Sequence, residues 1–340
     1  MSDQTVLLTG GAGFIGGNLA RYLRRERPGW TVINLDKLTY AGNLESITDL
    51  QTDPRHVFVR GDIANAELCE HLLRHHKVDA ILNLAAESHV DRSILGPGVF
   101  VETNVGGTQN LLEVARQAGV KRFVQVSTDE VYGSLGADGR FSETSPLQPS
   151  SPYSASKTAA DLIALAYHHT YKMDVVVTRC SNNYGPYQFP EKLIPLMIAN
   201  ALEGKKLPVY GDGMQVRDWI HVEDHCAAVL AALEHGKGGE VYNIGSDNEW
   251  PNLQIVKKLL QTLQKPESLI EHVRDRPGHD RRYAIDARKA KADLGWAPRI
   301  PFGDGLARTV EWYVANKPWW DRVRSGEYLK YYDRNYGSRS

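Results

Sequence analysis

Two side chains near the middle of the sequence have the types and spacing for proton and hydride chemistry. Tyr153 and Lys157 stand four residues apart, and this spacing brings two side chains to one face of a helix. A phenol with a pKa of about 10 is a weak base at neutral pH, so it needs a nearby positive charge to form phenolate. The Lys157 ammonium would supply one such charge. The alternative for the pair is a solvated helix face.

A second set of reactive side chains follows a predicted strand. Thr128, Asp129 and Glu130 come directly after the apolar run that ends at Ser127. Adjacent strand residues face opposite sides of a sheet, so both carboxylates reach one site only if the strand has ended. The alternative is a helix start, since Thr followed by acidic residues is also a capping pattern. As chemistry, an acid and a base beside a redox centre favour elimination of water.

A glycine-rich turn lies between the first predicted strand and the first predicted helix. Gly10, Gly13 and Gly16 have a spacing that lets a pyrophosphate approach the backbone and the helix N-terminus. Asp36 ends the second predicted strand, 20 residues beyond Gly16. A carboxylate there accepts hydrogen bonds from the adenosine ribose and repels a 2′-phosphate, which favours NAD over NADP. The adjacent Lys37 weakens that exclusion, and a turn made for packing alone is the alternative reading.

Two further strand ends are expected to complete the cofactor site. Asp62 and Ile63 would lie at an adenine edge, and the small residues at 84–86 permit close approach. Ligands of open α/β sheets lie at these carboxyl ends. The positive charge of an oxidised nicotinamide would then add to that of Lys157 in favouring phenolate at Tyr153.

These segments need a framework of alternating strands and helices. Apolar runs and helical periodicity predict strands at 5–9, 31–36, 56–59, 80–85, 123–127 and 175–179, with helices at 14–25, 110–117 and 154–171. Apolar strands separated by helices are typical of a parallel sheet covered on both faces. Right-handed crossovers then give a Rossmann-like, doubly wound α/β fold.

The sequence pattern changes after Cys180, where Pro and Gly become frequent. A helix at 222–234 and a strand at 240–244 resemble one more βα unit, and a further helix is predicted at 253–263. We expect an NAD-binding Rossmann domain over residues 1–179, to which a segment of about 218–246 returns, and a smaller α/β substrate-binding lobe over 180–340. An aromatic, helix-like tail at 306–336 is expected to pack in a core or subunit interface; its rings are Trp312, Trp319, Trp320, Tyr331 and Tyr332.

Composition excludes several classes of protein. The 340 residues carry 40 Lys and Arg against 41 Asp and Glu, a net charge of −1, whereas nucleic-acid and membrane-surface proteins are usually basic. Three distant cysteines give no disulfide framework and indicate a reducing compartment. No leader and no apolar stretch of membrane-spanning length is visible. We expect a cytoplasmic enzyme.

Two histidine-rich segments have spacings compatible with a metal, but we predict no metal site. His71 and His75, near Cys69 and His76, lie in a polar stretch without a further ligand. The segment from His221 to His225 also looks metal-like, but the family resemblance described below implies a capped helix start there. Cys180 is predicted to be a small packed residue.

The glycine turn, Asp36 and the set Ser127, Tyr153 and Lys157 together resemble the extended short-chain dehydrogenase/reductase superfamily. Within it, the chain resembles the dTDP-glucose 4,6-dehydratase family over nearly its whole length. The segments that carry this narrower resemblance are DKLTYAGNLES (36–46), LAAESHVDRS (84–93), STDEVYG (127–133), SPYSASK (151–157), RCSNNYGPYQFPEKLIP (179–195), RDWIHVEDH (217–225) and DRPGHDRRYAID (275–286).

The resemblance implies an NAD-dependent hydro-lyase that dehydrates dTDP-glucose to dTDP-4-dehydro-6-deoxyglucose, for deoxysugar synthesis of the rhamnose type. Tyr153 would take the 4-OH proton while C4 gives hydride to NAD, and Thr128 would bond the same hydroxyl. Lys157 would bind the nicotinamide ribose. Glu130 would then remove the C5 proton, and Asp129, with a raised pKa, would protonate the departing C6 hydroxyl before hydride returns to C6.

The resemblance also implies binding residues and a homodimer formed through a helical bundle. The implied NAD contacts are Gly10, Gly13, Phe14, Ile15, Gly16, Asp36, Lys37, Leu38, Thr39, Asp62, Ile63, Leu84, Ala85, Ala86, Thr103, Ser127, Tyr153, Lys157 and Asn183. The implied contacts to the sugar nucleotide are Ser88, Thr128, Asn182, Glu191, Lys192, Leu193, Pro208, Val209, Tyr210, Arg217, Asn252, Asp275, Arg276 and His279. Pro208 to Tyr210 would flank the thymine. Arginine suits the diphosphate because its planar fork pairs with phosphate oxygens.

Two alternatives remain open. One is a related nucleotide-sugar enzyme: a 4-epimerase, a decarboxylase or a dehydratase for another nucleotide. Asp129 and Glu130 argue against the first two, and the base-binding stretch at 207–210 must decide the last. The other is an NAD-binding regulator that has lost catalysis. The presence of a suitable residue at every catalytic position argues against it.

Overall fold

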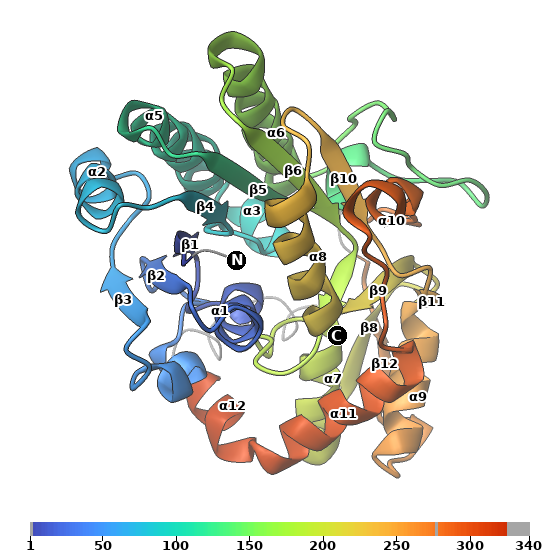
Figure 1. The fold of residues 1–340 in the computed structure, drawn as a ribbon. Helices are drawn as coiled ribbons and strands as arrows, with labels where there is room; N and C mark the ends of the chain where they lie inside the picture. The colour runs from blue at the N-terminus through green and yellow to red at the C-terminus, as the bar shows by residue number, and fades with distance from the viewer. Residues whose placement is uncertain (1–2, 276–277, 325–340) are drawn as a thin grey trace.

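A seven-stranded parallel sheet forms the centre of the computed structural model, which describes residues 3–275 and 278–324 (Figure 1). The strand order is β10-β6-β5-β4-β1-β2-β3, and the neighbouring strands run parallel. The predicted doubly wound α/β fold is confirmed. The order reverses between β1 and β4, which is where open α/β sheets bind ligands. The strands are β1 (Thr5–Thr9), β2 (Thr31–Asp36), β3 (His56–Arg60), β4 (Ala80–Asn83), β5 (Arg122–Thr128), β6 (Val175–Cys180) and β10 (Val241–Ile244).

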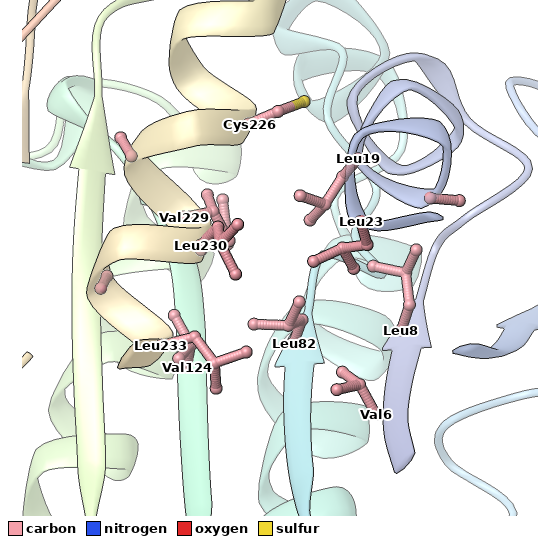
Figure 2. Packing of buried hydrophobic residues seen from close by; sticks show 14 of the residues in the cluster. Val6, Leu8, Leu19, Leu23, Leu82, Val124, Cys226, Val229, Leu230 and Leu233 are labelled. Atoms are coloured by element: carbon pink, nitrogen blue, oxygen red, sulfur yellow. The ribbon is translucent and has the colours of Figure 1, made fainter. Parts of the chain in front are cut away.

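Helices cover both faces of the sheet because its strands are apolar on both sides. In β1, Val6 and Leu8 point to one face and Leu7 to the other. Figure 2 shows the first of these cores, where Leu19 and Val229 bring two helices against the strands. That face is covered by α1 (Phe14–Glu26), α8 (Val222–His235) and α10 (Arg288–Leu294), the other by α2 (Ala66–His75), α5 (Thr108–Ala118) and α6 (Pro152–Tyr171).

Several short elements connect the strands, and hydrophobic periodicity did not predict them. They are the 3-10 helices η1 (Leu44–Leu50), η3 (Asp129–Tyr132) and η4 (Glu267–Leu269), the helices α3 (Val90–Leu95) and α4 (Gly98–Phe100), and the π-helical segment η2 (Val101–Gly107). Elements of three to seven residues are too short for a period to be visible. One of them, η3, carries two of the predicted catalytic residues.

Many elements beyond β6 build a separate apolar core beside the carboxyl ends of the main sheet, distinct from the cores on its two faces. We call it the second core. Its strands form a three-stranded sheet, β11-β9-β7, and a parallel pair, β12-β8. These elements are β7 (Asn182–Tyr184), β8 (Leu207–Tyr210), β9 (Val216–His221), β11 (Glu249–Pro251), β12 (Ile270–Val273), α7 (Leu193–Leu202), α9 (Asn252–Thr262), α11 (Phe302–Ala315) and α12 (Lys317–Val323).

The aromatic tail forms two helices rather than one. Asn316, with φ −111° and ψ 35°, separates α11 from α12. Trp319 and Trp320 are buried in the second core, and α12 reaches back to η1, where Arg322 pairs with Glu45 at 2.7 Å (Figure 1). Tyr331 and Tyr332 lie outside the described residues.

Residues beyond β6 also contribute to the main sheet. β10 is its edge strand next to β6, and α8 packs beside α1. The division of the chain into domains stays a prediction. Across the described ranges, no helix is both long and apolar enough to span a bilayer.

Candidate active site

The glycine turn packs closely against the start of α1 and leaves backbone donors of the first helical turn without side-chain partners. A Cβ on Gly16 would lie 2.1 Å from the Gly10 carbonyl oxygen, and Gly10 itself has a φ of +71°. Gly13 caps α1 without a side-chain hydrogen bond, and the first turn has no acidic residue. An anion can therefore approach the N–H groups and the positive end of the helix dipole. This turn fits a pyrophosphate, as its spacing indicated.

Asp36 lies at the end of β2 against this turn. Its carboxylate accepts hydrogen bonds from the backbone N–H groups of Ala12, at 2.9 Å, and Leu38, at 2.8 Å. Burial raises the pKa of Asp36, and these two bonds lower it. Lys37 pairs with Asp62 at 2.6 Å, so part of its charge is neutralised. Both observations support a preference for ribose hydroxyls over a 2′-phosphate.

One cavity runs from the glycine turn along the carboxyl ends of the strands to the predicted catalytic residues. Nearly all the predicted cofactor residues line it: Gly10, Gly13, Phe14, Ile15, Gly16, Asp36, Lys37, Thr39, Asp62, Ile63, Leu84, Ala85, Ala86, Thr103, Ser127, Tyr153, Lys157 and Asn183. Leu38 does not. Its side chain packs against the core that α1 and α8 share. Leu38 has a φ of +58°, so its side chain points in a different direction from those of Lys37 and Thr39.

Tyr153 and Lys157 enter the cavity from the first turns of α6. A reciprocal capping box between Ser151 and Ser154 fixes the start of this helix. The Lys157 ammonium donates to the Val126 carbonyl at 2.8 Å. Burial raises the pKa of Tyr153 well above its usual value, and the Glu130 carboxylate adds to this.

The expectation that Lys157 and the nicotinamide charge together lower the pKa of Tyr153 stays a prediction, since in the protein alone burial and the carboxylates outweigh any effect of Lys157. The ammonium points to a backbone carbonyl instead of the phenol, while the phenol is buried beside carboxylates. Formation of phenolate here needs a further positive charge beside Tyr153.

The acid/base pair lies at the end of β5, and both alternatives that the sequence left open hold at once. The strand ends at Thr128, whose hydroxyl caps η3 by accepting the Glu130 N–H at 3.3 Å. The helical turn then lets Asp129 and Glu130 both line the cavity. Asp129 is 1% exposed. Burial and the Glu130 charge raise its pKa well above the usual range, against a smaller opposing effect of Arg217.

Part of the predicted substrate site lines the same cavity: Ser88, Thr128, Asn182, Glu191 and Lys192. Lys192 donates to the Ser88 carbonyl at 3.1 Å. Burial raises the pKa of Glu191 to about 7, although Lys192 and Arg92 oppose this rise. A carboxyl that titrates near neutral pH thus faces the space beside the acid/base pair.

The other predicted substrate residues lie outside this cavity: Leu193, Pro208, Val209, Tyr210, Arg217, Asn252, Asp275 and His279. Several contact one another, since Tyr210 packs edge-on to His279 and His279 bonds Asp275 at 2.6 Å. Val209 is 2% exposed in the second core, because alternate residues of β8 face inward. Its side chain is therefore unavailable for contact with a base. Arg276 lies outside the described residues.

Some cavity residues were missed by sequence reasoning: Tyr40, Glu87, Cys180, Ser181, Gln188 and Phe189. Cys180 is a correction, because it lines the cavity as well as packing. Its thiol donates to the Ser127 carbonyl at 3.3 Å and accepts from Asn183 at 3.4 Å. Burial raises the pKa of Cys180 to about 12, so it is no nucleophile at neutral pH. Most of these residues stand within the quoted motifs, which was the available signal.

The histidine segments have structural explanations. His221 caps α8 by accepting the Glu223 N–H at 3.2 Å, as predicted. The rings of His71 and His75 stack at 5.3 Å on α2. Within the ranges that the structure describes, no three His, Cys, Asp or Glu residues are arranged to hold a metal ion.

Comparison with known proteins identifies the family. The family described as GDP-mannose 4,6 dehydratase matches residues 7–309. A dTDP-glucose 4,6-dehydratase of Xanthomonas campestris pv. campestris (strain B100) is 54% identical, covering 95% of this chain and 97% of that protein. The chain belongs to the dTDP-glucose 4,6-dehydratase family.

Solved structures agree with this family membership. DesIV, a dTDP-glucose 4,6-dehydratase from Streptomyces venezuelae crystallised with NAD, has a TM-score of 0.92 and 52% identity, covering 94% of this chain and all of that one. A UDP-glucose 4-epimerase from Thermotoga maritima has a TM-score of 0.86 but only 30% identity, over 92% of this chain and 100% of that one. The dehydratases are thus more similar in sequence than this epimerase.

Proposed function

We propose that this protein is an NAD-dependent hydro-lyase that converts dTDP-glucose to dTDP-4-dehydro-6-deoxyglucose. The observation that carries the proposal is the convergence of two reactive pairs in one cavity. Tyr153 and Lys157 lie on α6, Asp129 and Glu130 on η3, and the glycine turn of a dinucleotide site lines the same space. A simple dehydrogenase needs only the first pair, and elimination of water needs the second. The dTDP-glucose 4,6-dehydratase relatives support the choice of substrate.

NAD fits the residues of the site. The open α1 N-terminus suits the pyrophosphate, Asp36 suits the ribose, and Lys157 suits the nicotinamide ribose. When bound, NAD accepts hydride from C4 of the sugar, later returns it to C6, and adds a positive charge beside Tyr153. We infer that residues 1–179, with the segment at about 218–246, form the unit that binds it.

The side chains divide the proton transfers among them. Tyr153 takes the proton of the sugar 4-OH, and Thr128 holds that hydroxyl in place. The C4 ketone that results acidifies the C5 proton, which Glu130 then removes. Asp129 gives its proton to the departing C6 hydroxyl, a role that matches its raised pKa. The reaction is redox-neutral overall.

The sugar nucleotide is assigned to the region where the cavity meets the second core. Ser88, Asn182, Glu191 and Lys192 line the cavity and would contact the sugar diphosphate. Tyr210 and Pro208 would contact the base, and Arg217, Asn252, Asp275 and His279 would contact the deoxyribose and diphosphate; the sequence resemblance adds Arg276, which lies outside the described residues. The segment after Arg276 is assigned from the sequence resemblance.

A homodimer in the cytoplasm completes the proposal. Large apolar side chains are exposed on elements that pack against one another: Ile94 and Leu95 of α3, Val99 of α4, Val101 of η2 and Leu162 of α6. An apolar face of this kind favours association of two copies through their helices. Buried free cysteines are compatible with a reducing compartment.

Mass spectrometry of the sugar nucleotide tests the function directly. Purified protein is incubated with dTDP-glucose and no added NAD, and the denatured protein is analysed for cofactor. We expect loss of one water from the substrate and NAD released from the protein. Conversion of GDP-mannose or another nucleotide sugar in place of dTDP-glucose would overturn the choice of substrate. Bound NAD without conversion of any of them would contradict the enzymatic function.

A further inference from the structure

A buried carboxylate lies directly behind the Tyr153–Lys157 pair. Asp161 follows Lys157 by four residues on α6, so the phenol, the ammonium and the carboxylate share one face of the helix. Asp161 is 0% exposed and does not line the cavity. It can therefore affect the reaction only through its neighbours.

Asp161 is held in place by a charged partner on the sheet. Arg179 of β6 donates its Nε to Asp161 Oδ2 at 2.9 Å and its Nη1 to the Tyr132 hydroxyl at 2.9 Å. Tyr132 in turn donates to Asn243 at 2.8 Å. Because a guanidinium stays charged, the Asp161 carboxylate is its buried counter-ion and cannot swing away without a large loss of stability.

Lys157 is the second cation beside this carboxylate. Burial lowers the pKa of Lys157, and the Asp161 charge opposes that effect. Burial raises the pKa of Asp161, and the charges of Arg179 and Lys157 oppose this rise, as does the nearby Ser127 hydroxyl. The titratable and charged groups around Lys157 are Tyr153 and Asp161 on α6 and Arg179 and Cys180 on β6, with Asp129 and Glu130 beyond the phenol on η3.

We propose that Asp161 is a positioning residue: its carboxylate, anchored by Arg179 one helical turn beyond Lys157, keeps the ammonium charged behind Tyr153. The inference rests on the proposed function, because it explains how Lys157 retains its charge in that reaction. Without Asp161, the buried ammonium keeps its hydrogen bond to the Val126 carbonyl but loses a nearby negative charge that favours its protonated form. The lysine then loses its proton at a lower pH, and the cavity loses a positive charge.

Two variants separate this role from a structural one. Asp161→Asn keeps the side-chain volume but leaves Arg179 without its counter-ion. The double variant Asp161→Asn/Arg179→Gln removes both charges of the ion pair, and it carries the test where the single variant does not fold. The readouts are the pH profile of kcat/KM with dTDP-glucose and, without substrate, the titration of Lys157 by NMR in protein with isotope-labelled lysine. A Lys157→Met variant assigns the resonance.

We expect Asp161→Asn to move the alkaline limb of the profile to lower pH by about 1 to 2 units, and the Lys157 titration by a similar amount. The double variant should move both in the same direction but by less, because it also removes the positive charge of Arg179. The matched control is Asp174→Asn. It breaks another ion pair, Arg122–Asp174 at 2.8 Å, at the opposite end of β5 and β6. Its pH profile should equal that of the wild type.

An unshifted Lys157 titration and alkaline limb in the double variant would overturn the inference, whatever the level of turnover. Asp161 would then be only the structural partner of Arg179. A wild-type protein that does not dehydrate dTDP-glucose is a different result and contradicts the proposed function instead. The NMR titration still decides the effect of Asp161 on Lys157 in that case.

Discussion

Asp129 and Glu130 stand side by side in the sequence but have different surroundings in the fold. Asp129 is buried, whereas Glu130 is half-buried at the edge of the cavity. Burial and the neighbouring charge favour the protonated form of Asp129. Such a difference in environment divides two like groups into an acid and a base. Sequence spacing shows the residue types but not this difference in burial.

Replacing Asp129 should slow the reaction and stabilise the fold at alkaline pH. The pKa of Asp129 is raised in the folded state, so ionising this group destabilises the protein as the pH rises through the folded-state value. Near pH 8, we expect the free energy of unfolding of Asp129→Asn to be at least about 1 kcal/mol higher than that of the wild type. This gain in stability should vanish as the pH falls toward 3.8, the ordinary pKa of an aspartate carboxyl.

Urea unfolding without substrate measures this difference, and turnover should fall by a factor of about 100 to 10,000. The control is Asp138→Asn, an exposed carboxylate that should change neither quantity. A variant less stable than wild type near pH 8 would refute the assignment of Asp129 as the proton donor.

Glu191 should make substrate binding depend on pH. Its pKa of about 7 means that it gains a negative charge above neutrality, where an anionic diphosphate is proposed to bind. We expect KM for dTDP-glucose to rise several-fold as the pH increases through about 7, and Glu191→Gln to remove this rise. Steady-state kinetics across that range provides the check, with exposed Glu311→Gln as the control. An unchanged slope in Glu191→Gln would show that another group causes it.

At the scale of elements, the turn after β5 shows where sequence reasoning reaches its limit. The apolar run predicted a strand ending at 127, and the strand in fact ends at Thr128. That one residue decides which way Asp129 points. A helix cap and an acid/base pair would both use the residue types found at 128–130, so the sequence alone leaves both readings open. The start of α6 was predicted within two residues, because its cap and its apolar period agree.

The cap of α6 should matter for turnover, while an equivalent cap elsewhere should not. The Ser151 hydroxyl accepts the Ser154 N–H at 3.1 Å one residue before the helix that carries Tyr153. Asn65 caps α2 in the same way, accepting the Leu68 N–H at 3.0 Å, far from the cavity. Each change to Ala should cost about 1 kcal/mol of stability.

Only Ser151→Ala should also lower kcat, by several-fold, because loss of the cap lets the first turn of α6 fray and Tyr153 lies in that turn. Parallel unfolding and kinetic measurements on Ser151→Ala and Asn65→Ala make the comparison. Equal kcat values in the two variants would mean that the cap does not position Tyr153.

For the whole molecule, the sequence predicts the central sheet much better than the second core. Long apolar runs identify the six strands from β1 to β6, and a shorter run identifies β10. The strands β7, β8 and β11 were not predicted, because they are short and lie where Pro and Gly are frequent. The site follows the same rule. Most residues at strand ends were found, although Cys180 at the end of β6 was missed. Tyr40 and Phe189 reach the cavity from loops, where the quoted motifs were the only signal in the sequence.

The proposed homodimer should depend on the apolar face of α6 and its neighbours. Leu162 and Val314 are exposed to similar extents, 54% and 51%, on different helices. We expect Leu162→Lys to convert the dimer to a monomer, because a charge on an apolar interface is costly to bury. Val314→Lys should remain dimeric. Light scattering after size exclusion distinguishes these states, and a dimeric Leu162→Lys protein would place the interface elsewhere.

The central claim is that hydride leaves C4 and returns to C6 of the same sugar within one cavity. The most direct measurement uses dTDP-glucose carrying deuterium at C4, with the product analysed by NMR and mass spectrometry. We predict that the deuterium appears at C6 of dTDP-4-dehydro-6-deoxyglucose, with no added NAD needed. The proposed hydride transfer would be contradicted if the deuterium were lost to solvent, or if it stayed at C4 because that carbon was never oxidised.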